Sequence, residues 1–166
     1  MTPITDALLA ELDNEAATTR RVLERLPEDK FDWKPHPKSY SLGELGLHTA
    51  QVPGALSNLL TPDSVEPPTF QQGSARSRAE LLAALDQSMA DAREFIKGLT
   101  PERAETIWKM TSQGHDIIAA PRMALVRALV FNHWYHHRGQ LLVYLRLLDE
   151  PVPSVYGPTA DENPFG

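Results

Sequence analysis

The sequence contains no cysteine, and this absence excludes several kinds of site. Without thiols the chain forms no disulfide framework, holds no iron–sulfur cluster and has no thiolate nucleophile of its own. A protein-bound metal must therefore be held by histidine or carboxylate side chains. The absence also fits a reducing compartment, so we expect a cytoplasmic protein.

Basic residues and long apolar runs are also scarce. The chain has 16 Lys and Arg against 22 Asp and Glu, a formal net charge of −6. Its basic residues are scattered among acids, whereas nucleic-acid phosphates are bound by clustered Lys and Arg, so we expect no nucleic-acid partner. No run approaches the roughly 20 apolar residues of a membrane helix, so we expect no membrane association. A length of 166 residues with 42% hydrophobic residues predicts a single domain, 1–166.

The 14 prolines divide the chain into segments. In the long segments, apolar residues recur at three- and four-residue steps, which is typical of amphipathic helices. The expected helices cover about 4–26, 41–60, 77–97 and 121–148. Ser41 and Glu44 form a capping-box pattern at the start of the second helix, and Pro53 predicts a kink inside it. Since no stretch shows convincing strand alternation, we expect an all-α fold, a four-helix bundle.

Two long connections add a prediction about topology. Segment 61–76 has 16 residues. Fully extended, it could reach roughly 50 Å, whereas the second helix is only roughly 30 Å long. This linker can therefore cross the whole bundle, which predicts parallel second and third helices. Segment 98–120 is also long, and we expect a short helix over 101–108 within it.

Three of the six histidines lie in one five-residue stretch, 133–137, of the fourth expected helix. At 100° per residue, His133 and His137 differ by about 40° and stand one above the other. The apolar positions Val130 and Leu141 continue the same stripe, so this pair is predicted to face the core. His136 lies about 100° from His137, towards a partner helix or solvent.

Two imidazoles at this spacing suggest a metal site. Each could place a ring nitrogen about 2.0–2.1 Å from one ion, although core histidines hydrogen-bonded to neighbours are the plainer alternative. His48 lies in the apolar phase of the second helix and would supply a third ligand. The patterns of zincins and of carboxylate di-iron bundles are absent. A mononuclear site with three histidines keeps an open position for water or substrate.

These residues carry a resemblance to a known family. Trp33–Pro35, Ser41–His48, Asn132–Gln140 and the tail Pro151–Glu162 together resemble the DinB/YfiT-like superfamily of proposed metal-dependent enzymes. The resemblance implies a four-helix bundle with a long crossover between helices two and three. It implies a divalent metal ion, usually zinc or nickel, at His48, His133 and His137. It also implies a homodimer and, from characterised relatives, thiol S-transferase or isomerase chemistry with low-molecular-weight thiols.

Some residue assignments remain open. His133 could pair with His136 instead, but we prefer His137 because it precedes Arg138-Gly139-Gln140, as the second ligand of the family does. Glu44 could accept a hydrogen bond from a ligand imidazole, or only cap its helix. Arg138 could bind an anionic substrate, pair across a dimer or be structural. Tyr144 could supply a pocket hydroxyl or be an ordinary buried tyrosine.

The leading functional prediction is a metal-dependent enzyme of the thiol S-transferase or hydrolase type, acting on a small-molecule substrate. Because the chain has no cysteine, any reactive thiol must come from a cosubstrate. Two alternatives are a non-catalytic bundle that binds a metal or small ligand, and an interaction scaffold that packs these histidines without metal. Gly139, in the same motif, predicts close helix packing.

Overall fold

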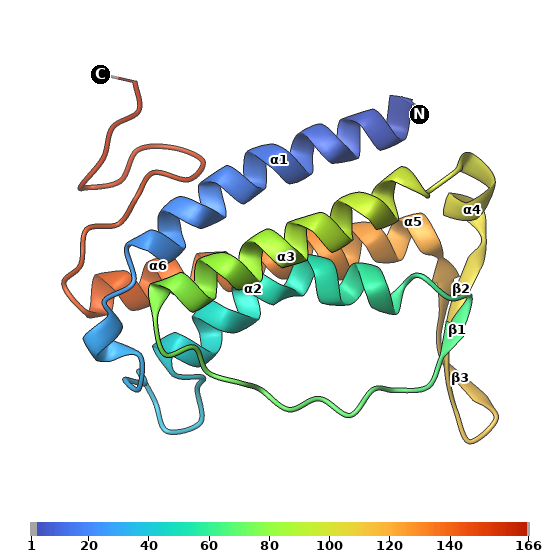
Figure 1. Ribbon diagram of the computed structural model, residues 1–166, viewed down its shortest axis with the longest axis horizontal. Coiled ribbons are helices and arrows are strands. Elements are labelled where there is room, and N and C mark those ends of the chain that lie inside the picture. Colours follow the sequence, from blue (N-terminus) through green and yellow to red (C-terminus); the bar gives the residue numbers. More distant parts are fainter. Residues whose placement is uncertain (1–2, 166) are drawn as a thin grey trace.

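The computed structural model describes residues 3–165 and is mostly helical (Figure 1). Within these residues, no helix is both long and apolar enough to cross a membrane. In chain order the elements are α1 (Pro3–Glu24), η1 (Glu28–Lys30), α2 (Leu42–Leu59), β1 (Ser64–Val65), α3 (Arg78–Lys97), α4 (Pro101–Glu105), β2 (Ile107–Ser112), β3 (His115–Pro121), α5 (Arg122–Leu125), η2 (Val126–Asn132) and α6 (His133–Leu147).

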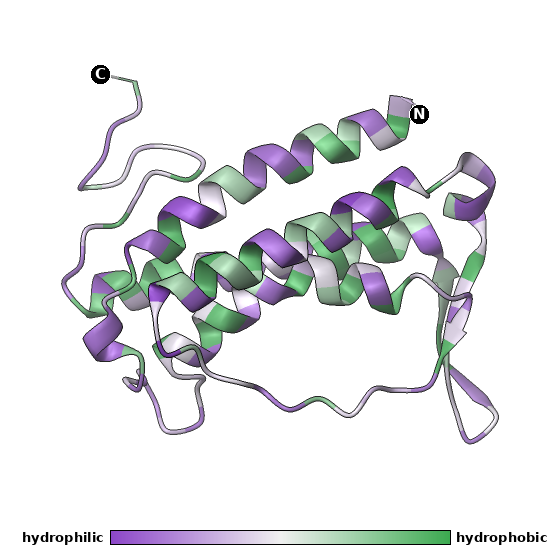
Figure 2. Ribbon diagram, in the orientation of Figure 1, coloured by the Kyte–Doolittle hydropathy of each residue, from purple (hydrophilic) through white to green (hydrophobic). Residues whose placement is uncertain are grey.

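The long helices pack side by side around one core. α3 contacts α1 and α2, and α6 contacts α1 and α2 (Figure 1). Each long helix carries both apolar and polar residues, as expected of helices with one buried face (Figure 2). The core combines residues from all of them; its fully buried members include Leu12, Leu23, Leu81, Val130 and Trp134.

The ends of the helices follow the local sequence signals. Ser41 Oγ accepts a hydrogen bond from the Glu44 N–H at 3.2 Å, and Glu44 Oε2 accepts one from the Ser41 N–H at 2.6 Å. This capping box confirms the predicted start of α2. Ser77 caps α3 by accepting a hydrogen bond from the Glu80 N–H at 3.2 Å, and Gly98 occupies the C-cap. The predicted third helix is therefore confirmed at both ends.

The crossover between α2 and α3 behaves as its length predicts. It runs back along the molecule from the end of α2 to the start of α3 (Figure 1). α2 and α3 consequently lie parallel. The crossover contributes the short strand β1 near its beginning and continues as extended chain. Its extended part passes over the face of α2 on which the candidate site lies.

The all-α expectation is wrong in one respect, because the structure contains a small sheet. Its strand order is β1-β2-β3, with β1 parallel to β2 and β2 antiparallel to β3. The short helix expected over 101–108 ends at Glu105, and Ile107 begins β2. Gln113 and Gly114 join β2 to β3 with φ of 51° and 82°, and positive φ at both central residues is the signature of a type I′ hairpin turn. Fully buried Trp108 anchors the sheet to the core.

The fourth expected helix is continuous in space but not regular. Between α5 and α6, residues Val126–Asn132 form a π-helix. Each of its hydrogen bonds spans five residues rather than four, so the segment is wider than an α-helix and holds additional residues per turn. The π segment ends directly before His133, where α6 begins. It therefore sets the rotation of the helix that carries two of the candidate ligands.

Pro53 lies inside α2, and α3 satisfies the backbone groups around it. The hydroxyl of Ser88 on α3 accepts a hydrogen bond from the Gly54 N–H at 2.8 Å and donates to the Gln51 carbonyl at 3.2 Å. The two helices approach closely here. A Cβ atom at Gly54 would lie 2.7 Å from the Ser88 Cα. The sequence Pro53-Gly54 thus ties the middle of α2 to α3.

Gly54→Ala is expected to destabilise the protein by about 2–3 kcal/mol, because the new methyl group would push the α3 backbone away. Urea unfolding would measure this change. Gly139→Ala is the matched control, since a Cβ there would meet nothing within 4 Å. The predicted packing role of Gly139 is therefore wrong, and its substitution should stabilise α6 by up to about 1 kcal/mol. Equal effects of the two substitutions would contradict this account.

Candidate metal centre

Three histidines from two helices converge at one point. α2 supplies His48, and α6 supplies His133 and His137. The Nε2 atom of His137 lies 2.7 Å from Nε2 of His133 and 3.1 Å from Nε2 of His48. Among residues 3–165, this is the group of His, Asp and Glu side chains whose ligand atoms come close enough to share a metal ion, all within 4.8 Å of one another.

These distances fit a common divalent ion. Two nitrogens that each lie about 2.1 Å from an ion, at an angle of roughly 90–110°, are roughly 3.0–3.4 Å apart. The separations of 2.7 and 3.1 Å are close to this range, so small ring movements would complete the geometry. Within the described part of the chain no fourth His, Asp or Glu joins the group. The arrangement therefore offers three ligands and leaves coordination positions open.

The surroundings favour the neutral imidazoles that metal binding requires. Burial first, and then the neighbouring rings of His137 and His133, lower the pKa of His48 to about 4. Burial is also the main cause that lowers the pKa of His133 and of His137. All three rings are thus uncharged at neutral pH, with lone pairs free to bind a cation.

Each of the three rings also has a partner outside the cluster. His137 Nδ1 lies 2.8 Å from Oε1 of Gln140, an arrangement in which the Nδ1–H donates and the lone pair stays on Nε2. The backbone carbonyl of Leu129 interacts with His133 in a way that raises its pKa. The side chain of Gln72 does the same for His48.

Gln72 is a functional candidate that the sequence patterns do not reveal. It lies on the crossover, where no periodicity marks it. Its amide nitrogen donates to the carbonyls of Glu44 at 2.9 Å and Gly73 at 2.8 Å. These bonds fix the amide, whose Oε1 is buried and has no hydrogen-bond partner within residues 3–165. This oxygen is therefore free to accept a hydrogen bond from the ring of His48, whose pKa the Gln72 side chain raises. Gln140, by contrast, lies in the recognised motif on α6.

Gln140→Ala is expected to lower the affinity for a divalent metal about tenfold, because it removes the acceptor that orients His137. Isothermal titration calorimetry with zinc would measure the loss. Gln51→Ala is the control, since Gln51 lines the adjacent cavity and is not among the groups that interact with the three rings. Its metal affinity should stay within about twofold of the wild type. An equal loss in both variants would contradict the orienting role of Gln140.

The structure places His136 outside the cluster. Its side chain is exposed, and its ring packs edge-on against His137 with centroids 5.0 Å apart. Of the two pairings considered, the geometry therefore joins His133 with His137. These two histidines also lie at the edge of the core rather than within it. They are half-buried, whereas the fully buried line on α6 runs through Trp134, Leu141 and Leu145.

Glu44 and Tyr144 occupy supporting positions. The Glu44 carboxylate accepts the capping hydrogen bond from Ser41 and lies 3.1 Å from Nζ of Lys34, and both interactions lower its pKa. The Tyr144 hydroxyl donates to the Tyr40 carbonyl at 3.1 Å, and its ring packs edge-on against Trp33. Tyr144 therefore supports the loop that carries Tyr40, whose side chain does line the cavity at the metal site.

Arg138 points to the other side of α6. Its guanidinium is buried and lies 2.5 Å from the carboxylate of Glu15 on α1. It also donates to Thr19 Oγ1 at 3.2 Å and to the Tyr156 hydroxyl at 2.5 Å. It packs over the rings of Tyr135 and Tyr156. These contacts join α6, α1 and the C-terminal tail. Of the three roles considered for Arg138, they favour the structural one.

A cavity of about 680 Å³ opens beside the three histidines. Its walls come from α2, from α6 and from the crossover. Phe70 on the crossover packs edge-on against His48, with ring centroids 5.7 Å apart. Tyr40 lies on another side of the same imidazole, at 5.8 Å. A small molecule in this cavity would therefore reach the open side of the histidine cluster.

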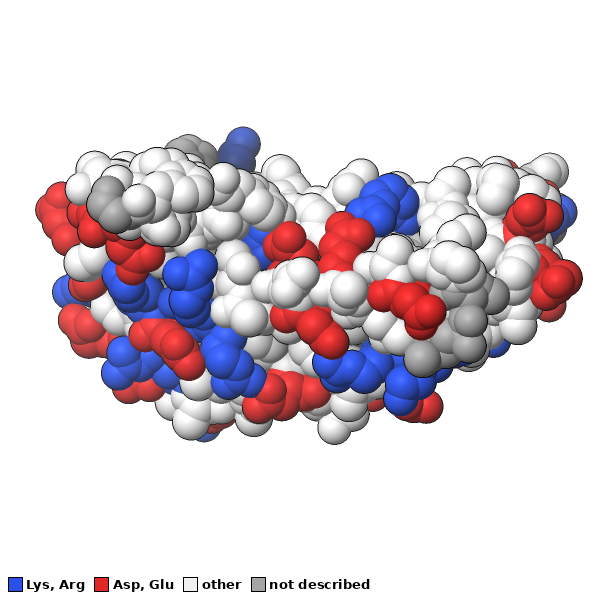
Figure 3. All heavy atoms as spheres, turned by 90° about the horizontal axis from the view of Figure 1, so that it is seen from above, with Lys and Arg blue, Asp and Glu red and all other residues white. Residues whose placement is uncertain are grey.

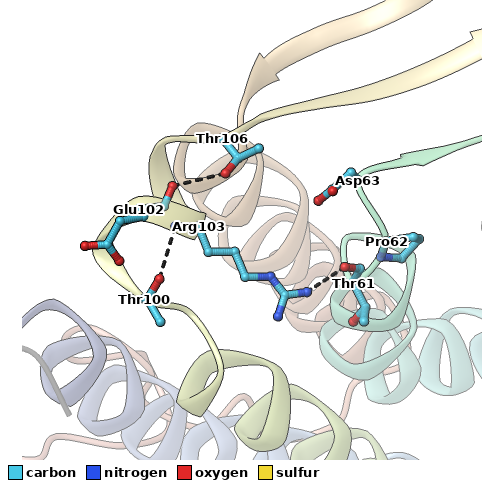
Figure 4. Close-up of a pocket in the computed structure, with 7 residues that line it drawn as sticks. All are labelled: Thr61, Pro62, Asp63, Thr100, Glu102, Arg103 and Thr106. Atoms are coloured by element: carbon cyan, nitrogen blue, oxygen red, sulfur yellow. Dashed lines mark hydrogen bonds between the residues drawn. The ribbon is translucent and has the colours of Figure 1, made fainter.

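A second cavity of about 550 Å³ lies where α4 meets the end of α2, and it is lined mostly by polar groups (Figure 4). Arg103 donates to the Thr61 carbonyl at 2.6 Å, and Thr106 Oγ1 donates to the Glu102 carbonyl at 3.0 Å. Asp63 pairs with buried Arg122 at 2.5 Å. These groups hold the junction together, and no histidine lies among the lining residues.

Charges of both signs are interleaved on the face seen in Figure 3. Elsewhere the structure has ion pairs between helices: Arg20 pairs with Asp86, and Arg93 with Asp13. Arg127 binds Glu11 with two hydrogen bonds, at 2.6 and 2.8 Å. Basic and acidic side chains therefore alternate across this face instead of separating into two surfaces of opposite charge.

Comparisons with known proteins agree with this architecture. The sequence profile of the DinB family matches residues 1–163. The uncharacterized protein YrdA of Bacillus subtilis (strain 168) is 26% identical over 160 residues, which cover 95% of this chain and 90% of YrdA. A DinB-like protein from Bacillus cereus ATCC 10987 superposes with a TM-score of 0.71 at 22% identity, over 91% of this chain and 97% of that one. The DinB-like protein YjoA from Bacillus subtilis gives a TM-score of 0.65 at 17% identity, over 94% and 98%.

Proposed function

The chain belongs to the DinB family, and we propose that it binds a divalent metal ion, zinc or nickel, through His48, His133 and His137. The observation that carries this proposal is the convergence of three neutral ring nitrogens beside a cavity, with no fourth His, Asp or Glu joining them within residues 3–165. A purely structural zinc site is closed by four protein ligands. Three ligands and an open side are typical of catalytic sites.

We propose that the protein is a metal-dependent enzyme of the S-transferase or hydrolase type. When bound, a divalent ion supplies Lewis acidity, which makes water or a thiol nucleophilic at neutral pH. The chain's own residues provide the rest. Gln140 and the Leu129 carbonyl orient two of the ligand rings, while Phe70 and Tyr40 shield the imidazole of His48. The sequence has no cysteine, so a reacting thiol would come from a cosubstrate.

The second candidate function is a non-catalytic bundle that binds a metal or a small ligand. It would be distinguished by metal binding without catalytic turnover. Untagged protein should be loaded with zinc or nickel and assayed with glutathione, bacillithiol, mycothiol and coenzyme A against a chromogenic electrophile. It should be assayed in parallel against esters. Metal-dependent turnover that disappears on chelation and returns on reloading supports the enzyme. Full metal occupancy without turnover on any of these substrates would favour the binding bundle.

A further inference from the structure

Beyond the histidines, the cavity is lined mainly by apolar side chains. One wall is a continuous face of α2 that follows His48 at helical spacing. It consists of Val52, Ala55, Leu56 and Leu59. Pro68 and Phe70 line the cavity from the crossover. The cavity volume of about 680 Å³ is that of a typical small-molecule site.

The same walls carry no charge. No Lys, Arg, Asp or Glu is among the lining residues. Apart from the three histidines, Gln51 and Tyr40 are the polar side chains of the lining. Away from the histidine cluster, a carboxylate or phosphate is strongly disfavoured, because no charged partner there compensates its loss of water. Hydrocarbon surface, in contrast, is stabilised by every apolar wall.

The α2 wall of the cavity is long, and its two ends differ chemically. From His48 to Leu59 the wall spans 11 residues of α2, which is about 16 Å at 1.5 Å per residue. The histidine cluster lies at one end of this span. A molecule that fills the cavity would thus place one terminal group at the metal and its remaining length against aliphatic side chains.

We infer that the substrate is an uncharged molecule with an extended hydrocarbon part, whose single reactive polar group lies at the metal end of the cavity. This inference rests on the proposed metal-dependent function and specifies its substrate class. For an S-transferase, the cavity would hold the hydrocarbon part of the acceptor. For a hydrolase, it would hold the apolar side of the bond that is cleaved.

Displacement of the neutral fluorescent probe N-phenyl-1-naphthylamine from zinc-loaded protein would test the substrate class. Primary alkanethiols from butanethiol to octanethiol should bind about fourfold more tightly for each added methylene. 8-Mercaptooctanoic acid, which has the same chain length and a terminal carboxylate, should bind about tenfold or more weakly than octanethiol. Affinity that is independent of chain length, or equal affinity for the acid, would overturn the inference.

A charge placed in the wall provides the matched test. Ala55 is an exposed helical position that lines the cavity, so Ala55→Lys should fold normally. It should weaken binding of the probe and of octanethiol about tenfold and bring the affinity of 8-mercaptooctanoic acid close to that of octanethiol. Asn58→Lys adds the same charge one turn away on α2, outside this cavity, and should leave all these affinities unchanged. Equal effects of the two substitutions would overturn the inference.

Metal content, measured on the same samples, separates this inference from the proposed function. Metal-loaded protein that binds neither the probe nor the alkanethiols would overturn the substrate class and leave the metal site standing. Protein that binds the probe in the apolar cavity but holds no zinc or nickel would overturn the proposed function, and with it the assignment of the cavity to a substrate.

Discussion

The double variant His133→Ala/His137→Ala is expected to lose its divalent metal, falling from about one ion per chain to a few per cent. The reason is geometric. Both side chains stand on one face of α6, and their Nε2 atoms are 2.7 Å apart, so one helix supplies two of the three ligands. His48 alone cannot retain the ion. Elemental analysis of protein purified without an affinity tag would measure the change.

Thermal or urea unfolding gives a second measurement of the same loss. A ligand that binds only the folded state, at a concentration about 100 times its dissociation constant, stabilises the wild type by about 2.7 kcal/mol. The double variant should gain nothing from added zinc. His136→Ala is the matched control, because His136 is exposed, lies in the same helix and is not part of the cluster. If the double variant retained the metal, or if the control lost it equally, the proposed metal site would be contradicted.

Arg138→Met is expected to destabilise the protein by about 3–5 kcal/mol while leaving metal content unchanged. Only 1% of the Arg138 side chain and 14% of the Glu15 side chain are exposed, and the two groups lie 2.5 Å apart. Removal of the cation would strand a carboxylate in a poorly hydrated position and free the Tyr156 hydroxyl from its donor. Urea unfolding followed by circular dichroism would measure the difference.

Arg93→Met is the comparison for this prediction. Arg93 pairs with Asp13 across α3 and α1, but 39% and 53% of these side chains are exposed, so the loss should stay below about 1 kcal/mol. The variant Arg138→Met/Glu15→Leu should recover much of the stability, since it removes both buried charges together. A large loss of metal in Arg138→Met at unchanged stability would instead assign Arg138 to the site.

The sequence predicted the helices because their signals are local. Apolar spacing fixed the buried faces of α1 and α3, and the Ser41–Glu44 capping box fixed where α2 begins. The parallel direction of α2 and α3 was predicted from the length of the linker 61–76 alone. The resemblance, together with the spacing of His133 and His137, identified the cluster that the structure assembles with His48.

What the sequence did not predict depends on contacts between distant segments. The hairpin has a signal, since Gln113-Gly114 follows a short stretch in which Trp108 and Met110 alternate with more exposed residues. Six residues of weak alternation are nevertheless too few to outweigh a helical expectation. Gln72 has no local signal, because only folding brings the crossover over α2. The apolar pattern of the sequence does not reveal the π segment either. Val126 and Val130 are buried, and their spacing fits an α-helix as well as a π-helix.

The π segment has a consequence for which changes in chain length this helix tolerates. Loss of one residue within Val126–Asn132 can be absorbed, because the wide turn can tighten to ordinary α-helical winding while the helix on either side keeps its orientation. Loss of one residue between His133 and His137 cannot be compensated in this way, because that stretch is ordinary α-helix. It would turn one imidazole about 100° away from the other. Natural length variation in this helix should therefore be confined to the stretch before His133, and a homologue that lacks the wide turn can still present both histidines to α2.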